Sequence, residues 1–258
     1  MTAEKKMRLD GKSVLITGGG SGLGREMALT FAREGAKIGI NDIKPESAHN
    51  VLTEVKAIGG TAVALVADVS KSSAVKKMFA EFLRAFGTID VLINNAGIAR
   101  AARFPEVQGT AELGDEDWHQ MLATHIDSTF YCTREALKVM IPKKSGKIIN
   151  LGSIAGTTGL AGASDYCAAK GAIISFSKSV AKEVVPFGVL VNCIAPGFIQ
   201  TPMTAPIPAD IKKQIEAATP IGHFGEPRDI ALAALYLASD DANFMVGQVL
   251  SPNGGYVI

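Results

Sequence analysis

The sequence is poor in the residues that disulfide scaffolds, metal sites and membrane spans require. It contains only three cysteines and four histidines in 258 residues. The cysteines, Cys132, Cys167 and Cys193, are far apart and odd in number, which favours a reducing compartment and predicts a cytoplasmic location. The histidines show no metal-ligand spacing, so we expect no metal. No apolar run is long enough to cross a bilayer and no signal peptide is visible, so no membrane partner is expected.

Charge is scarce and nearly balanced. Charged residues make up 20% of the chain, the formal net charge is +1, and no long run carries one sign. Proteins that bind nucleic acids or membrane surfaces usually carry a basic patch, so neither partner is expected. Hydrophobic residues, at 47%, are abundant enough for a folded domain with a large buried core.

Short β-branched segments alternate with amphipathic segments along most of the chain. We predict strands at 13–17, 37–41, 61–67, 91–94, 147–151, 190–195 and 248–250. We predict helices at 24–34, 45–58, 72–86, 118–140, 165–185, 209–218 and 226–238. This alternation predicts an α/β fold, a Rossmann-like doubly wound parallel sheet of about seven strands with helices on both faces. No linker or repeat divides the chain, so residues 1–258 are expected to form a single domain.

Two segments rich in proline or glycine interrupt this alternation, at 100–117 and 200–220. Long irregular segments inside a compact domain are often lids or binding loops. We interpret the segment at 200–220 as a substrate lid. The segment at 100–117 is either a second binding loop or a plain surface excursion.

A glycine-rich turn joins the first predicted strand to the first predicted helix. Glycine lets the backbone approach a pyrophosphate closely, and a helix N-terminus offers free amides and a positive dipole end. The spacing differs from the common G-x-G-x-x-G fingerprint, but its place between strand and helix indicates a dinucleotide site. The residues of the turn that we expect to contact the cofactor are Gly18, Ser21, Gly22, Leu23 and Gly24.

Polar or small residues follow the next three predicted strands. Asp42 closes the second strand, where a carboxylate can accept hydrogen bonds from both ribose hydroxyls and repels a 2′-phosphate. We therefore predict NAD as the cofactor rather than NADP, although Lys44 is a nearby cation. After the third and fourth strands, the residues expected to contact the adenosine half are Asp68, Val69, Asn95, Ala96 and Gly97.

Tyr166 and Lys170 are four residues apart and therefore share one face of a predicted helix. A free phenol titrates near pH ~10, and a neighbouring ammonium group is expected to lower its pKa toward a useful range. Ser153, thirteen residues before Tyr166, can donate a hydrogen bond to a substrate oxygen that shares its proton with the tyrosine. Together these side chains predict an acid–base device that interconverts an alcohol and a ketone.

The motifs, in this order, resemble those of the short-chain dehydrogenase/reductase family. They are TGGGSGLG at 17–24, DV at 68–69, NNAG at 94–97, Ser153, YCAAK at 166–170 and PGFIQT at 196–201. The resemblance implies that Tyr166 is the catalytic acid/base, that Lys170 binds the nicotinamide ribose and that Ser153 polarises the substrate oxygen. It also implies assembly as a homotetramer or homodimer through the two longest helices and the last strand. The residues implied at the nicotinamide are Tyr166, Lys170, Pro196, Gly197, Ile199 and Thr201.

One position departs from the family pattern. The family usually has an asparagine seven residues after the tryptophan that corresponds to Trp118, and this chain has His125 there. That asparagine is thought to kink its helix and to hold a relay water partly through its main-chain carbonyl, which a histidine retains. His125 is therefore either a tolerated replacement or an additional titrating catalytic group. Slowed or lost activity is the third reading.

The expected substrate pocket is walled by small residues and by the apolar residues Leu160, Met203, Ile207 and Ile211, which favours a neutral secondary alcohol or ketone. A cyclic alcohol, a hydroxysteroid, a sugar alcohol and a 3-hydroxyacyl compound all fit, and Arg100 and Arg103 are the charges within reach. The nearest alternative is an NADPH-dependent 3-oxoacyl-carrier-protein reductase, against which Asp42 counts. A nucleotide-binding scaffold or sensor without chemistry is the non-enzymatic alternative, against which the intact catalytic residues count.

Overall fold

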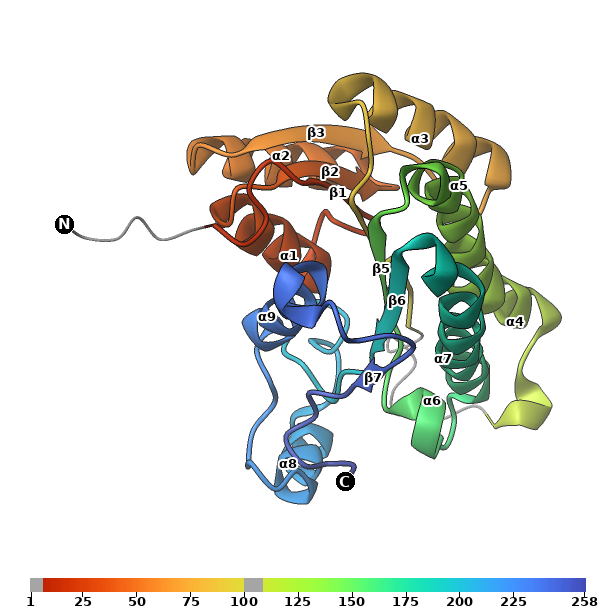
Figure 1. The fold of residues 1–258 in the computed structure, drawn as a ribbon. Coiled ribbons are helices and arrows are strands. Elements are labelled where there is room, and N and C mark those ends of the chain that lie inside the picture. Colours follow the sequence, from red (N-terminus) through yellow and green to blue (C-terminus); the bar gives the residue numbers. More distant parts are fainter. Residues whose placement is uncertain (1–6, 100–108) are drawn as a thin grey trace.

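The computed structural model describes residues 7–99 and 109–258. Within them, seven parallel strands form one sheet in the order β3-β2-β1-β4-β5-β6-β7 (Figure 1). The strands are β1 (Ser13–Ile16), β2 (Lys37–Asp42), β3 (Thr61–Val66), β4 (Val91–Asn94), β5 (Gly146–Leu151), β6 (Val189–Ile194) and β7 (Val249–Leu250). This sheet confirms the predicted fold class.

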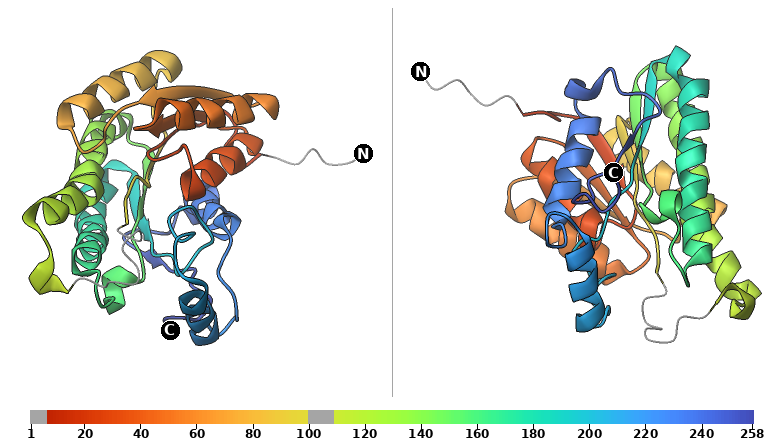
Figure 2. Two further views of the ribbon diagram at one scale, coloured as in Figure 1. Left: turned by 180° about the vertical axis from the view of Figure 1, so that it is seen from behind. Right: turned by 90° about the horizontal axis from the view of Figure 1, so that it is seen from below.

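Helices cover both faces of the sheet. They are α1 (Gly22–Arg33), α2 (Pro45–Ala57), α3 (Ser72–Phe86), α4 (Asp115–Leu122), α5 (Ser128–Lys143), α6 (Ala155–Thr158), α7 (Ser164–Val184), α8 (Ala209–Ala218) and α9 (Pro227–Ala238). Seen from below, α1, α2 and α9 lie on one side of the sheet, and α5 and α7 lie on the other (Figure 2, right). None of the helices in the described part of the chain is both long and apolar enough to cross a bilayer.

The strands are apolar on both faces because both faces are covered. Successive residues of a strand point to opposite sides of the sheet. In β1, Val14 and Ile16 are buried in the core cluster that includes α1, α2 and α9. Leu15, between them, is buried in the cluster that includes α3, α5 and α7. This is the pattern expected for a central strand of a parallel sheet.

The helix predicted at 118–140 is wrong in one respect, because it is not a regular α-helix throughout. A π-helical turn at Ala123–Asp127 separates α4 from α5. The Ser128 amide donates to the carbonyls of Ala123 and His125. Apolar periodicity does not reveal such a turn, which widens the helix locally and often marks a functional position.

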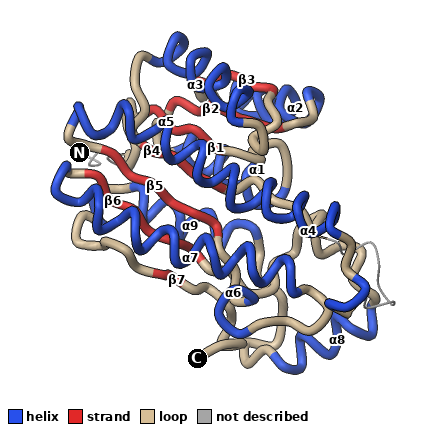
Figure 3. The backbone as a smooth tube through the Cα atoms, turned by 90° about the vertical axis from the view of Figure 1, so that its right-hand side faces the viewer, coloured by secondary structure: helices blue, strands red, loops and turns tan. Residues whose placement is uncertain are grey.

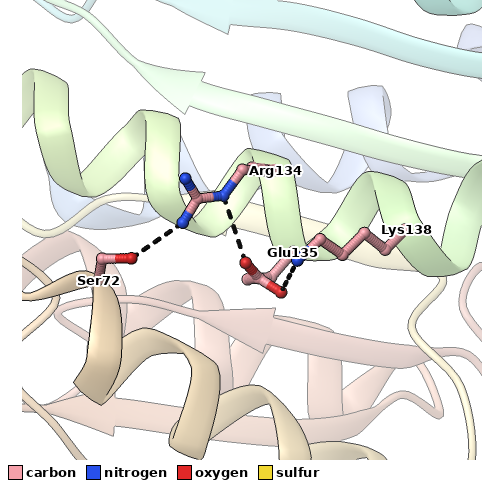
Figure 4. A network of polar contacts seen from close by, with 4 residues as sticks. All are labelled: Ser72, Arg134, Glu135 and Lys138. Atoms are coloured by element: carbon pink, nitrogen blue, oxygen red, sulfur yellow. Dashed lines mark hydrogen bonds and ion pairs between the residues drawn. The ribbon is translucent and has the colours of Figure 1, made fainter.

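Arg134 links α5 to α3. Its guanidinium donates to Ser72 Oγ at 2.9 Å and to the Glu135 carboxylate at 3.3 Å (Figure 4). Lys138 Nζ donates to the other carboxylate oxygen of Glu135 at 2.7 Å. The guanidinium also lies over the ring of Phe130, 5.0 Å from its centroid. The two ion pairs lie within α5, so the Ser72 bond is the part of this network that reaches α3; apolar residues of both helices also pack in one core cluster.

The strand order brings β1 beside β4, although β2 and β3 lie between them in the sequence. Connections leave the carboxyl ends of β1 and β4 in opposite directions at this switch point. A crevice therefore opens there, and it is the usual ligand site of such sheets. Figures 1 and 3 show α6 and α8 together at one end of the molecule, and both follow segments that line this crevice.

Phe82 should be a major source of stability for α3. Its side chain is 0% exposed, and Gly39 leaves room for its ring, since a Cβ on Gly39 would lie 2.5 Å from Phe82 Cδ2. Phe82→Ala should lower the free energy of unfolding by about 3–5 kcal/mol, because it leaves a cavity under the helix. Urea denaturation measures the loss. Phe244→Ala, at a fully exposed ring (101%), is the control and should cost less than about 0.5 kcal/mol; similar losses in both variants would contradict this packing.

Candidate active site

A cavity of about 1120 Å³ lies at the carboxyl ends of the strands. This volume slightly exceeds the usual range for small-molecule sites, which is roughly 300–1,000 Å³. Each of the first six strands is followed by residues that line it. In strand order β1 to β6, examples are Gly18, Ile43, Asp68, Asn95, Ser153 and Pro196.

The turn between β1 and α1 forms a cradle that excludes side chains. Gly18 and Gly22 have φ values of +61° and +51°, which L side chains rarely adopt. A Cβ on Gly24 would lie 2.1 Å from the Gly18 carbonyl oxygen, and one on Gly18 would lie 2.9 Å from Ala96 Cα. The first amides of α1 have no partner within the helix and open beside this turn. The cradle therefore fits the pyrophosphate of a dinucleotide.

Hydrogen bonds across the switch point fix the cradle. Thr17 Oγ1 accepts the amides of Asn95 and Ala96 at 3.0 and 3.1 Å. In return, Asn95 Nδ2 donates to the carbonyls of Thr17 and Gly18, both at 3.0 Å. The ends of β1 and β4 thus hold each other at the distance that keeps the crevice open.

The carboxylate of Asp42 is held at the wall of the cavity by two backbone amides. Oδ2 accepts from the Gly20 amide at 3.1 Å, and Oδ1 accepts from the Lys44 amide at 3.0 Å. A Cβ on Gly20 would lie 2.6 Å from Oδ2, so this glycine admits the carboxylate. The carboxylate is therefore fixed in place beside the glycine-rich turn, where Asp42 lines the cavity.

Tyr166 and Ser153 meet at the opposite part of the same cavity. Tyr166 is half-buried on α7, and Ser153 follows β5. Burial raises the pKa of the phenol above its usual value of 10, and a hydrogen bond with Ser153 acts in the opposite direction. The neutral, protonated phenol is the favoured form.

Lys170 lies one turn further along α7 and is only 5% exposed. Its Nζ donates to the Leu151 carbonyl at 2.7 Å and lies 5.6 Å from the centroid of the Tyr166 ring. Burial lowers the pKa of this ammonium group to about 8. We expected Lys170 to lower the pKa of Tyr166; this expectation is wrong for this structure, because burial outweighs the other influences on the phenol.

His125 lies in the π-helical turn and is 0% exposed. Burial, followed by the charge of Lys170, lowers its pKa from 6.5 to about 3. The imidazole is therefore neutral at neutral pH, which argues against His125 as a group that titrates near neutrality. Its main-chain carbonyl accepts hydrogen bonds from Ser128 Oγ at 3.1 Å and from Thr129 Oγ1 at 2.7 Å.

All but one of the predicted site residues line the cavity. The exception is Gly24, which packs behind the turn against Gly18. The predicted cofactor residues that line it are Gly18, Ser21, Gly22, Leu23, Asp42, Asp68, Val69, Asn95, Ala96, Gly97, Tyr166, Lys170, Pro196, Gly197, Ile199 and Thr201. The predicted catalytic residues that line it are Ser153, Tyr166, Lys170 and His125.

The walls expected around the substrate are present in part. Leu160, Met203 and Ile207 line the cavity, whereas Ile211 does not. Arg100 and Arg103 lie outside the described residues. Sequence reasoning missed other lining residues, among them Ser47, Ile98 and Thr124. Of these residues, Ile98 could have been predicted to line the cavity, because it directly follows the NNAG segment.

Comparisons with known proteins extend over nearly the whole chain. The family model described as Enoyl-(Acyl carrier protein) reductase matches residues 18–257. The 3-oxoacyl-(acyl-carrier-protein) reductase FabG of Thermotoga maritima is 36% identical over 252 residues, which cover 98% of this chain and 100% of that protein. The 2,5-dichloro-2,5-cyclohexadiene-1,4-diol dehydrogenase LinX of Sphingobium indicum is 40% identical over 251 residues, covering 97% and 98%.

The structure of this chain also resembles a solved structure. The crystal structure of a short-chain type dehydrogenase/reductase from Mycobacterium marinum superposes with a TM-score of 0.91 and 29% identity. The match covers 98% of each chain. The likeness therefore includes the strands, the crevice and the helices that carry the site.

His125 should make the protein acid-sensitive. Because its pKa falls from 6.5 to about 3 on folding, the unfolded chain binds a proton between those pH values that the folded chain does not. Stability is therefore lost as the pH falls through this window. Between pH 7 and 5, the native protein should lose about 2 kcal/mol more of its free energy of unfolding than His125→Asn. Urea denaturation at both pH values measures this, and an equal pH dependence of the two proteins would contradict it.

Proposed function

The chain belongs to the short-chain dehydrogenase/reductase family, and from that premise we propose an NAD(H)-dependent oxidoreductase that interconverts a neutral secondary alcohol and a ketone. One observation carries the proposal. Tyr166, Ser153 and the buried Lys170, one turn beyond the tyrosine, line the same cavity as a glycine cradle that fits a dinucleotide.

The chain's own residues handle the proton of the reaction. When bound, a nicotinamide dinucleotide supplies the hydride acceptor for oxidation or the hydride donor for reduction. In the reductive direction, Tyr166 Oη gives its proton to the carbonyl oxygen while Ser153 Oγ hydrogen-bonds the same oxygen. In the oxidative direction, the phenolate takes the hydroxyl proton back. The raised pKa of Tyr166 favours the protonated phenol, which is the form that reduction requires.

The choice of NAD rests on Asp42. Its carboxylate is fixed by the amides of Gly20 and Lys44 and cannot swing away without losing both hydrogen bonds. A ribose 2′-hydroxyl can donate to a carboxylate held in this way, whereas a 2′-phosphate would meet a like charge.

The substrate class follows from the cavity wall beside Tyr166. Seven described residues of this lining are small or apolar, namely Ile154, Leu160, Ala161, Gly162, Ala163, Met203 and Ile207, while Asp165, which precedes Tyr166 in the sequence, also lines the cavity and is 0% exposed. A neutral substrate avoids the cost of an unpaired buried charge there. The diol dehydrogenase of Sphingobium indicum, 40% identical, supports a ring alcohol as the first class to test.

A second candidate is an NADPH-dependent 3-oxoacyl-carrier-protein reductase. The 36% identity with the Thermotoga maritima reductase of that name favours it. The fixed carboxylate of Asp42 counts against NADPH. A comparison of the two dinucleotides therefore separates the candidates.

The domain organisation, the lid, the location and the assembly of the protein are proposals as well. We infer a single domain over 1–258, with a substrate lid at about 200–220 and a cytoplasmic location. We also infer a homotetramer or homodimer that uses α5 and α7, where Phe130, 42% exposed, lies edge-on to Phe176. At the start of the lid, Thr204 Oγ1 donates to the Ile199 carbonyl at 2.6 Å and accepts from the Thr201 amide at 3.0 Å.

Tyr166→Phe should abolish turnover but preserve cofactor binding. The variant removes the proton carrier while leaving the glycine cradle intact, so kcat should fall by about 10²–10⁴. Turnover is followed at the reduced nicotinamide absorbance with a panel of cyclic secondary alcohols, and binding by titration with NADH. Tyr236→Phe, on α9 and outside the cavity lining, is the control and should match the native protein. Full activity in Tyr166→Phe would exclude the proposed mechanism, and absent turnover in the native protein would favour a nucleotide-binding scaffold.

Native protein should turn over NADH faster than NADPH, and Asp42→Ser should reverse or erase this preference. Removing the carboxylate removes the repulsion of a 2′-phosphate, so the ratio of kcat/KM values should change by at least about tenfold, or about 1.4 kcal/mol. Asp10→Ser, at an exposed position before β1, is the control with an equal change in charge. A native preference for NADPH would contradict the assignment of NAD and favour the carrier-protein reductase.

A further inference from the structure

Residues 251–257, which we call the C-terminal strap, lie behind the loop that leaves β6. The Gly197 amide donates to the Pro252 carbonyl at 3.0 Å. Asn253 approaches this loop so closely that a Cβ on Gly197 would lie 2.7 Å from Asn253 Cα. Gly197 also lines the cavity. The strap therefore backs the stretch of wall at which the nicotinamide of a dinucleotide is expected.

The same strap contacts the end of the proposed lid. The Ile221 amide donates to the Gly254 carbonyl at 3.1 Å, and a Cβ on Gly254 would lie 2.7 Å from Ile221 Cγ2. Ile221 follows α8, beside which the end of the chain lies (Figure 1). The ring of Tyr256 packs edge-on against that of Phe198, with centroids 5.3 Å apart. The strap thus links the loop after β6 to the segment after α8.

The chain on either side of the lid is also paired with itself. Ile199 and Gly225 form an isolated parallel bridge. The Gly225 amide donates to the Phe198 carbonyl at 3.0 Å, and the Gln200 amide donates to the Gly225 carbonyl at 2.9 Å. A shift of the loop after β6 would therefore be transmitted to both ends of the lid.

The side chain of Asn253 holds the strap in its folded shape. Its Oδ1 accepts from the Gly255 amide at 2.8 Å, and its Nδ2 donates to Ser251 Oγ at 3.0 Å and to the Val257 carbonyl at 2.9 Å. Between these partners, Gly254 and Gly255 have φ values of +65° and +86°, which L side chains rarely adopt. An amide side chain supplies both an acceptor and donors. One side chain therefore links the two sides of a glycine turn.

We propose that Asn253 is a positioning residue, which keeps the strap folded against Gly197 and thereby fixes the wall of the nicotinamide site. The inference rests on the proposed function, because it needs a dinucleotide in the cavity. Asn253 is not among the described residues that line the cavity, so it acts through the loop after β6. Small displacements of reacting groups are costly to the rate. The glycine cradle is fixed separately by Thr17 and Asn95, so the rest of the dinucleotide site should stay intact.

Binding of two ligands separates this role from general damage to the fold. ADP-ribose lacks the nicotinamide ring, whereas NADH carries it. In Asn253→Ala, the Kd for NADH should rise by about fivefold or more, and the Kd for ADP-ribose should stay within about twofold of the native value. Asn253→Asp keeps the acceptor for the Gly255 amide and should restore most of the affinity for NADH. Asn243→Ala, at an exposed position after α9, is the control and should bind both ligands as the native protein does.

Hydrogen exchange tests the contacts of the strap without any ligand. The amides of Gly197 and Ile221 donate to the strap, so they lose protection when it opens. Exchange of segments 196–200 and 219–223, read by mass spectrometry, should be about tenfold faster in Asn253→Ala than in the native protein. Turnover should fall in parallel, with kcat lower by about tenfold or more in Asn253→Ala.

Two results overturn the proposal. One is an unchanged Kd for NADH in Asn253→Ala, and the other is an equal loss of affinity for NADH and ADP-ribose. If the native protein binds NADH but turns over no alcohol or ketone, the proposed function fails, and the ratio of the two Kd values still decides the role of Asn253. A native protein that binds neither ligand contradicts both proposals.

Discussion

Burial of one ammonium group, that of Lys170, governs the electrostatics of the site. The side chain is 5% exposed, and its Nζ donates to the Leu151 carbonyl at the end of β5. Burying a cation disfavours its charged form, so its pKa falls to about 8. The same charge helps to keep His125 neutral. Lys170 therefore acts on the pKa of His125, whereas burial and Ser153 act on the pKa of Tyr166.

Close packing of α6 against α7 accompanies the burial of Lys170. A Cβ on Gly156 would lie 2.6 Å from the carbonyl carbon of Lys170, so a glycine is needed where α6 crosses α7. On the other side of the crevice, the glycines of the β1–α1 turn leave a matching space for a ligand. The sheet supplies the rest, since the carboxyl ends of its parallel strands bring residues distant in sequence to one edge.

Much of this arrangement follows from the sequence, because local patterns determine it. Strand and helix bounds follow from periodicity, and the cavity residues follow from motifs at the ends of strands, as with Asp42 at the end of β2 and Ser153 after β5. The features that the sequence did not predict depend on tertiary packing. The π-helical turn packs against α7, and the raised pKa of Tyr166 depends on how deeply that side chain is buried. Neither burial nor a side-chain hydrogen bond to the backbone leaves a periodic signal.

The central claim is that a hydride passes directly between a carbinol carbon and a nicotinamide dinucleotide bound in this cavity, with Tyr166 handling the proton. The most direct measurement uses a secondary alcohol that the native protein oxidises, deuterated at the carbinol carbon, with NAD as the acceptor. Mass spectrometry of the reduced dinucleotide should find one deuterium per molecule formed. A reduced dinucleotide free of deuterium would contradict the account.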